Sequence, residues 1–193
     1  MKKILIFLLI LSNLSFAAQN LPVNSKELDK ILDQAFENID RGNTQKGVLI
    51  LKKKISEDPT EIIYKAILGS IYDGAGRKNE AEKEFDEAVR LQEKYPFIAG
   101  DGKKYDIRFM IGMFYSFTED YTSALKWLNQ VDEKEYNEMF KDEPMLKDFL
   151  FGIFNYNDNN PEEAKKYLFK SSVYDKDGVS ENILGMIYLD EGN

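Results

Sequence analysis

The chain has 193 residues, of which 43% are hydrophobic and 13% aromatic, enough for one globular domain or a short helical array with a continuous core. It carries 26 Lys and Arg against 34 Asp and Glu and no His, and the resulting net charge of -8 disfavours binding to nucleic acid or anionic lipid. Because Cys and His are both absent, thiol nucleophiles, Ser-His-Asp triads, Cys/His zinc sites and disulfides are excluded. Carboxylate, Lys or Tyr chemistry and a hard metal on oxygen ligands remain, but no motif for them is present, so we expect no cofactor and no enzyme.

The N-terminus has the pattern of an export signal. Met1-Lys2-Lys3 is a charged start, residues 4–11 are an apolar run, and Ser15-Phe16-Ala17 offers small residues for cleavage. We predict a signal peptide over residues 1–17, and therefore a periplasmic or secreted protein without stable membrane insertion. A membrane anchor is the main alternative, but a span needs about 20 apolar residues and Ser12 interrupts this run too early. A lipid-anchored N-terminal cysteine is excluded by the absence of Cys.

The clearest pattern in the rest of the chain predicts two helices that pack together. Its positions follow one another at the spacings of three and four residues that put side chains on one helical face. They are Leu68, Gly69, Tyr72, Ala81, Phe85 and Ala88. Residues 73–76 interrupt the pattern with two glycines. Since the small residues at 69, 81 and 88 let two helix backbones approach closely, the pattern favours an antiparallel helix pair.

This spacing resembles the tetratricopeptide repeat, a helix-turn-helix unit of 34 residues. The same frame recurs along the chain, with its seventh and eighth positions at Gln34-Ala35, Leu68-Gly69, Ile111-Gly112, Phe151-Gly152 and Leu184-Gly185. Residues 183–188 also resemble Sel1-like repeats, which have the same architecture. The resemblance implies an all-α, right-handed solenoid of antiparallel helix pairs, with about four and a half repeats over residues 26–193 after a short linker at 18–25.

Helix punctuation gives the expected element boundaries. Asn24, Asp120 and Asn160 precede predicted helices as capping residues, and Pro161 follows Asn160 at the first helical position. The longer joints between repeats predict a loop at 96–102 and one extra helical turn, packed on the surface, around Tyr136, Met139 and Phe140. We predict no strand and nine helices, near 26–41, 44–56, 60–74, 78–94, 105–118, 121–131, 144–156, 161–174 and 179–190.

The resemblance also implies where a partner binds, because ligands of this family commonly lie along the concave face formed by the first helices. The equivalent positions give the candidate partner-binding residues Phe36, Phe109, Met113, Phe117, Phe149, Ile153 and Tyr156. Such a groove suits a protein or peptide with apolar anchors and basic flanks. The alternative, that each of these side chains is ordinary core, remains open.

One binding mode of the family is argued against by the residues themselves. Some members hold a peptide carboxylate with Lys and Asn at the fifth and ninth positions. Here the fifth and ninth positions hold Leu32 and Phe36, Ala66 and Ser70, Phe109 and Met113, and Phe149 and Ile153. The carboxylate clamp is therefore missing.

Residues that suggest other chemistry have simpler interpretations. Asp142-Glu143 and Glu162-Glu163 are interpreted as solvated helix ends, because adjacent residues on a helix point apart while a catalytic pair must flank one bond. Asp158-Asn159-Asn160 lacks the twelve-residue calcium loop and is interpreted as a turn. Trp127 is expected to pack between repeats.

The last predicted helix, at 179–190, is apolar nearly all round and has no second helix after it. A longer chain, a second copy or partner, or folding back onto the fourth repeat would each cover it, and we favour a longer chain. The leading hypothesis for function is an exported scaffold or adaptor. The alternatives are the helical domain of an envelope hydrolase whose catalytic part is absent, and a purely structural homo-oligomer.

Overall fold

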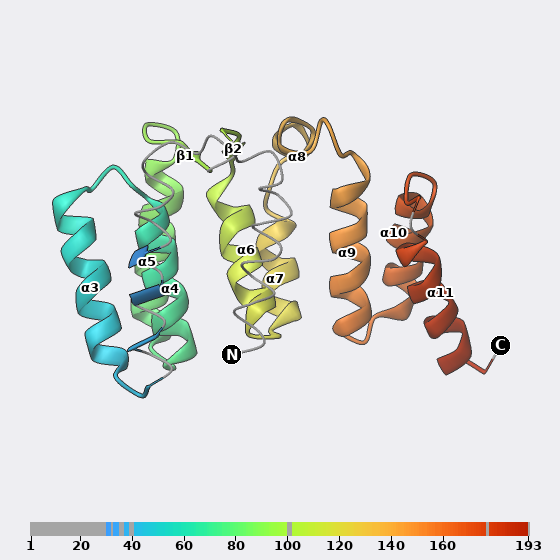
Figure 1. The fold of residues 1–193 in the computed structure, drawn as a ribbon, viewed down its shortest axis with the longest axis horizontal. Helices are drawn as coiled ribbons and strands as arrows, with labels where there is room; N and C mark the ends of the chain where they lie inside the picture. Colours follow the sequence, from blue (N-terminus) through green and yellow to red (C-terminus); the bar gives the residue numbers. More distant parts are fainter. Residues whose placement is uncertain are drawn as a thin grey trace. The chain divides into compact units, whose positions relative to one another are not determined.

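The computed structural model describes residues 30–31, 33–34, 37–38, 41–99, 102–176 and 178–192. The predicted signal peptide, the linker, Asn24 and Phe36 lie outside the described residues. Two compact units divide the chain, residues 1–117 and 118–193. Each unit is built of helices joined by short turns, so the predicted all-α fold is confirmed (Figure 1).

The first unit contains four complete helices and a short pair of strands. Its elements are α3 (Thr44–Glu57), α4 (Ile63–Gly74), α5 (Lys78–Leu91), β1 (Phe97–Ile98), β2 (Lys104–Tyr105) and α6 (Ile107–Phe117). Helix α4 packs against α3, α5 and α6. The described residues of the helix predicted at 26–41 are helical, with Ile31 buried.

Burial in this unit follows from the residues that each helix carries. Helix α4 is apolar on most sides and has eight buried residues, because neighbouring helices cover it on several faces. Helix α5 is largely charged and buries only Ala81, Phe85 and Ala88, the narrow stripe typical of an amphipathic helix at a surface. The turn between them needs Gly76, whose φ of +73° is strained for other residues.

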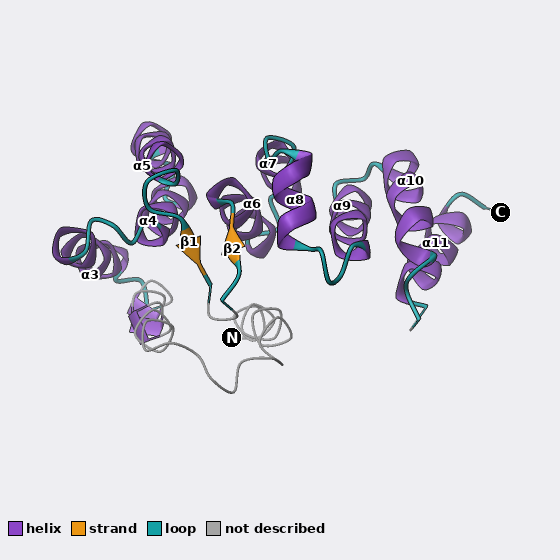
Figure 2. Cartoon of the chain, turned by 90° about the horizontal axis from the view of Figure 1, so that it is seen from above, coloured by secondary structure: helices purple, strands orange, loops and turns teal. Residues whose placement is uncertain are grey.

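The second unit contains five helices. They are α7 (Tyr121–Leu128), α8 (Glu133–Met139), α9 (Met145–Asn157), α10 (Pro161–Ser172) and α11 (Val179–Asp190). Figure 2 shows α9, α10 and α11 side by side, and α10 contacts both of the others. Their shared core consists of Ala164, Leu168, Leu184 and Ile187.

Helix starts follow the predicted punctuation in part. The carboxylate of Asp120 accepts a hydrogen bond from the backbone N–H of Ser123 at 3.0 Å, as expected for a capping residue. Pro161 is the first residue of α10, but the side chain of Asn160 donates to the Asn155 side-chain oxygen at 3.2 Å instead of capping the helix.

The joints between repeats hold two features that the sequence pattern did not predict. The prediction of no strand is wrong, because β1 and β2 pair antiparallel, with Phe97 opposite Tyr105. Both side chains are buried, so the strands are fixed by burial of two aromatic rings. The extra helix α8 exists as predicted, but it is not a surface turn, because Tyr136, Met139 and Phe140 are all buried.

Candidate partner-binding surface

Two helix pairs are held together by the same device, a glycine on the first helix that receives a bulky side chain from the second. A Cβ atom at Gly69 would lie 2.6 Å from Cε1 of Phe85, and a Cβ atom at Gly152 would lie 2.7 Å from Cγ of Leu168. No side chain larger than hydrogen fits at such distances without a shift of the neighbour. We call each such contact a glycine cradle.

Charged groups beside the first glycine cradle bind α4 to α5. Lys65 Nζ on α4 lies 3.9 Å from Glu84 Oε2 on α5, the residue before Phe85, and both side chains are largely covered. The guanidinium of Arg77 lies 4.2 Å from the centre of the Tyr72 ring, a cation–π contact at the turn. The ring of Phe85 also contacts Tyr115 of α6, with centroids 6.0 Å apart. Phe85 therefore packs both within its pair and against the next helix.

In the first unit the candidate binding residues lie on α6. Phe109 and Met113 are buried, with 4% and 6% of their surfaces exposed, and Phe117 is half-buried. The ring of Phe109 stacks on Tyr105 of β2 at 6.0 Å between centroids. The joint between repeats therefore contacts the fifth position of the third repeat, a long-range contact that periodicity does not reveal.

An acidic group at the edge of these positions already has a cationic partner. Asp106 is buried, and its two carboxylate oxygens accept hydrogen bonds from Arg108 at 2.9 and 2.6 Å. One of those oxygens also accepts from the Arg108 backbone N–H at 2.8 Å. Since the charge is compensated inside the protein, Asp106 positions the start of α6 more than it attracts a basic partner.

In the second unit the candidate binding residues Phe149, Ile153 and Tyr156 lie on α9 and are half-buried. Phe149 and Tyr156 pack against the core shared by α10 and α11. Ile153 is the ninth position of its repeat. The structure therefore gives Phe149 and Tyr156 a packing role, and all three keep part of their surface exposed.

Helix α8 is fixed to the start of α9 by polar and aromatic contacts. The Tyr136 hydroxyl donates a hydrogen bond to the Leu128 carbonyl at 2.7 Å, and its ring meets Phe151 edge-on at 5.9 Å. Lys147 of α9 forms an ion pair with Glu133 and lies 4.9 Å from the centre of the Tyr136 ring. Sequence reasoning found the aromatic spacing of α8 but not these partners.

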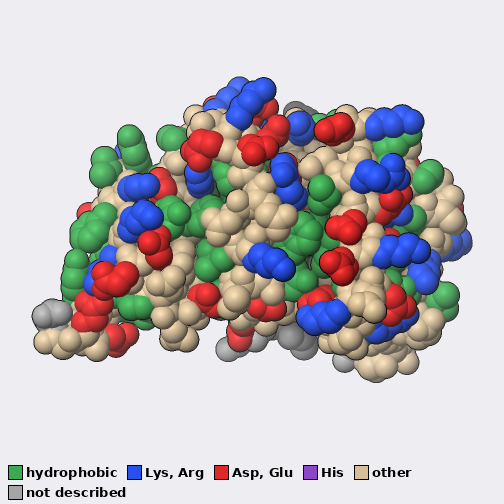
Figure 3. Space-filling model, turned by 180° about the vertical axis from the view of Figure 1, so that it is seen from behind, with side chains coloured by type: hydrophobic (Ala, Val, Ile, Leu, Met, Phe, Trp, Pro, Cys, Tyr) green, Lys and Arg blue, Asp and Glu red, His purple; other side chains and the backbone are tan. Residues whose placement is uncertain are grey.

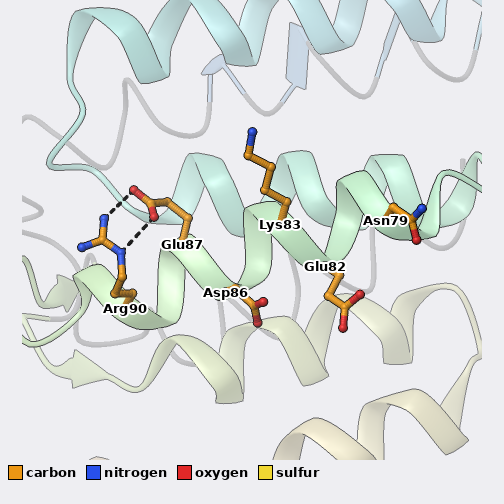
Figure 4. Close-up of a pocket in the computed structure, with 6 residues that line it drawn as sticks. All are labelled: Asn79, Glu82, Lys83, Asp86, Glu87 and Arg90. Carbon is orange, nitrogen blue, oxygen red and sulfur yellow. Dashed lines mark hydrogen bonds and ion pairs between the residues drawn. The ribbon is translucent and has the colours of Figure 1, made fainter.

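The described residues offer little for catalysis. A hollow of about 410 Å³ lies on α5, and all of its lining residues come from that helix: Asn79, Glu82, Lys83, Asp86, Glu87 and Arg90 (Figure 4). Arg90 donates to Glu87 at 2.8 and 3.0 Å and lowers the pKa of that carboxyl. A surface formed by one helix does not enclose a substrate.

Other acidic groups have structural partners. Asp158 accepts a hydrogen bond from the Thr122 hydroxyl at 2.6 Å, as expected for a turn residue. In the described ranges, no cluster of three acidic side chains is placed to hold a metal ion. On the face drawn in Figure 3, acidic and basic side chains are interspersed with hydrophobic ones.

Comparisons with known proteins agree with this geometry. A family model described as tetratricopeptide repeat matches residues 64–95 and 105–133, which contain α4 with α5 and α6 with α7. These segments are tetratricopeptide repeats. Among solved structures, one from the work "Functional Characterization of Pseudomonas Aeruginosa pilF" matches with a TM-score of 0.52 and 17% identity, over 84% of this chain and 68% of that one. No curated protein matches the sequence.

The comparisons establish the repeat type and the fold. The match at 105–133 begins at the first position of the third repeat in the sequence frame, so the frame is confirmed there. Because the PilF identity is below 25%, that likeness shows the fold alone. Within the described part of the chain, none of the helices combines the length and apolar character needed to span a bilayer.

Proposed function

We propose that this chain is an exported scaffold that binds a protein or peptide partner along the first helices of its repeats. The observation that supports this most directly is on α9, where Phe149, Ile153 and Tyr156 are half-buried at the fifth, ninth and twelfth positions of one repeat. Side chains three and four residues apart share a helical face, so these three form one apolar strip. Such a strip suits apolar anchors of a partner.

The charge of the chain bears on the chemistry of that partner. A net charge of -8 favours basic flanks on either side of the apolar anchors. A free carboxylate is disfavoured, because the fifth and ninth positions of the second repeat are the fully buried Ala66 and Ser70, whose hydroxyl donates to the Ala66 carbonyl at 3.0 Å. The partner is therefore an internal segment of a protein more than a chain end.

Export is the second element of the proposal and rests on the sequence of residues 1–17. Their charged start, apolar run and small residues fit a cleaved signal peptide. The scaffold would then act in the periplasm or outside the cell.

Site-specific crosslinking in cells tests the binding surface without a folding penalty. A photoreactive phenylalanine placed at Ile153 is expected to capture a discrete partner, because this side chain lies on the proposed strip. The matched control is the same residue at Leu49, which is 56% exposed on α3 and outside the strip. Equal labelling from both positions, or none from position 153, would contradict the proposed surface.

A further inference from the structure

The first helix of a further repeat, α11, carries a glycine cradle that nothing fills. Gly185 occupies the eighth position of its repeat, as Gly69 and Gly152 do in theirs. A Cβ atom built at Gly185 would meet nothing within 4 Å, whereas at Gly69 it would lie 2.6 Å from Phe85. In the described structure Gly185 is exposed, so the contact that defines the other two pairs is absent here.

The rest of α11 is firmly docked, which makes its open face a preformed surface. The buried hydroxyls of Ser171 and Ser180 lie 2.9 Å apart, and the Ser180 N–H donates to Asp175 at 2.6 Å. Lys165 of α10 donates to Glu191 at 2.9 Å. On the open side, large apolar groups stay exposed: Val179 by 43%, Met186 by 45% and Leu189 by 76%.

We propose that α11 binds an amphipathic helix of a separate, basic partner protein, with a bulky apolar side chain seated on Gly185 and a Lys or Arg directly before it. This site is independent of the strip on α9. The size of the seated group follows from the filled cradles, which hold Phe85 and Leu168. Small residues on the turns before and after it would let the helices approach, as Ala81 and Ala88 do on α5.

Charge selects the partner. Helix α11 contains Glu181 and Asp190 and no Lys or Arg. Glu181 stands four residues before Gly185, where Lys65 stands four before Gly69 and pairs with Glu84. Because the sign is reversed on α11, the equivalent partner residue must be basic. A second copy of α11 would bring acidic groups against acidic groups, which disfavours self-pairing.

Two peptides that differ at one position test the proposal by titration against the 193-residue chain. The first has the sequence of residues 77–94, which contains Ala81, Glu84, Phe85 and Ala88, and the second carries Glu84→Lys. We expect the lysine peptide to bind about fivefold more tightly, the size of effect measured for a partly exposed ion pair. The protein variant Glu181→Lys should reverse this preference.

The cradle itself is tested by Gly185→Leu, which fills the space and should weaken binding of the lysine peptide at least tenfold. The variant should fold, because its side chain meets no neighbour. Gly74→Leu is the matched control, since Gly74 also lies in a helix with open space around it. Binding that Gly185→Leu leaves unchanged, or no binding of either peptide, would overturn the proposal.

Two further outcomes would assign the surface to another occupant. If the chain forms a dimer in sedimentation that Gly185→Leu dissolves, the occupant is a second copy. If a chain extended beyond residue 193 no longer binds the lysine peptide that the 193-residue chain binds, the occupant is a following segment of the same chain. Either result overturns a separate basic partner.

Discussion

The pair formed by α4 and α5 and the single helix α11 present the same glycine in opposite circumstances. Gly69 is buried beneath the ring of Phe85, and Gly185 is exposed with no atom near it. The residue type is identical, so its value at each position is set by the neighbour and not by the backbone. Comparing the two shows that a repeat motif predicts where a contact can form, whereas only the structure shows whether it has formed.

The largest expected effect concerns the side chain that fills the first cradle. Phe85→Ala should lower the free energy of unfolding by about 3 to 5 kcal/mol, because a buried ring is removed and a cavity is left between three helices. The matched control Phe169→Ala removes a ring that is 51% exposed and should change stability by less than about 0.5 kcal/mol. Urea unfolding followed by circular dichroism measures both, and similar losses would contradict the packing described.

The same contrast can be made with leucine in the second unit. Leu168→Ala empties the cradle of Gly152 and should cost about 2 to 5 kcal/mol. Leu189→Ala shortens a side chain on the open face of α11 that is 76% exposed, and should leave stability nearly unchanged. A large loss on Leu189→Ala in thermal unfolding would mean that the face is covered in solution.

Much of this organisation could be predicted from the sequence, because it depends on local periodicity. The helix predicted at 179–190 has those bounds in the structure, and the glycines at positions 69 and 152 accept the expected partners. What periodicity misses is contact between segments far apart in the repeat frame. Tyr105 covering Phe109 and Tyr136 bonding Leu128 both come from the joints between repeats, whose lengths follow no pattern.

The candidate binding residues show the same limit. Their positions on α6 and α9 follow from the repeat frame, but Phe109 and Phe149 lie at the same frame position, and one is buried while the other is half-buried. The difference arises from neighbours, since β2 packs on Phe109. The pattern gives the face of a helix, and the degree of exposure needs the structure.

The smallest expected effect is a dependence on pH at the start of α4. Burial, and secondarily the charge of Asp58, raise the pKa of Glu61 above its ordinary value. A raised acid pKa means that the folded state binds the proton more tightly, so the contribution of Glu61 to stability is present at low pH and is lost as the pH rises through the ordinary value toward the raised one. Glu61→Gln should therefore be more stable than the wild type at neutral pH.

The measurement is urea unfolding at pH 7 and again below pH 4, where both side chains are neutral and the advantage should vanish. The start of α11 provides the contrast, because Asp175 there accepts a backbone N–H, a contact that favours the charged form. An advantage of Glu61→Gln that is equal at both pH values would contradict the assignment.

The unfolding free energies of Gly69→Ala and Gly185→Ala test the central comparison most directly. Alanine gains helix propensity over glycine by about 1 kcal/mol at either position. At position 185 nothing opposes the gain, so we predict a stabilisation of that size. At position 69 the new methyl group overlaps Phe85, so we predict a net loss of about 1 to 3 kcal/mol. Changes of the same sign would contradict a filled cradle on α4 and an open one on α11.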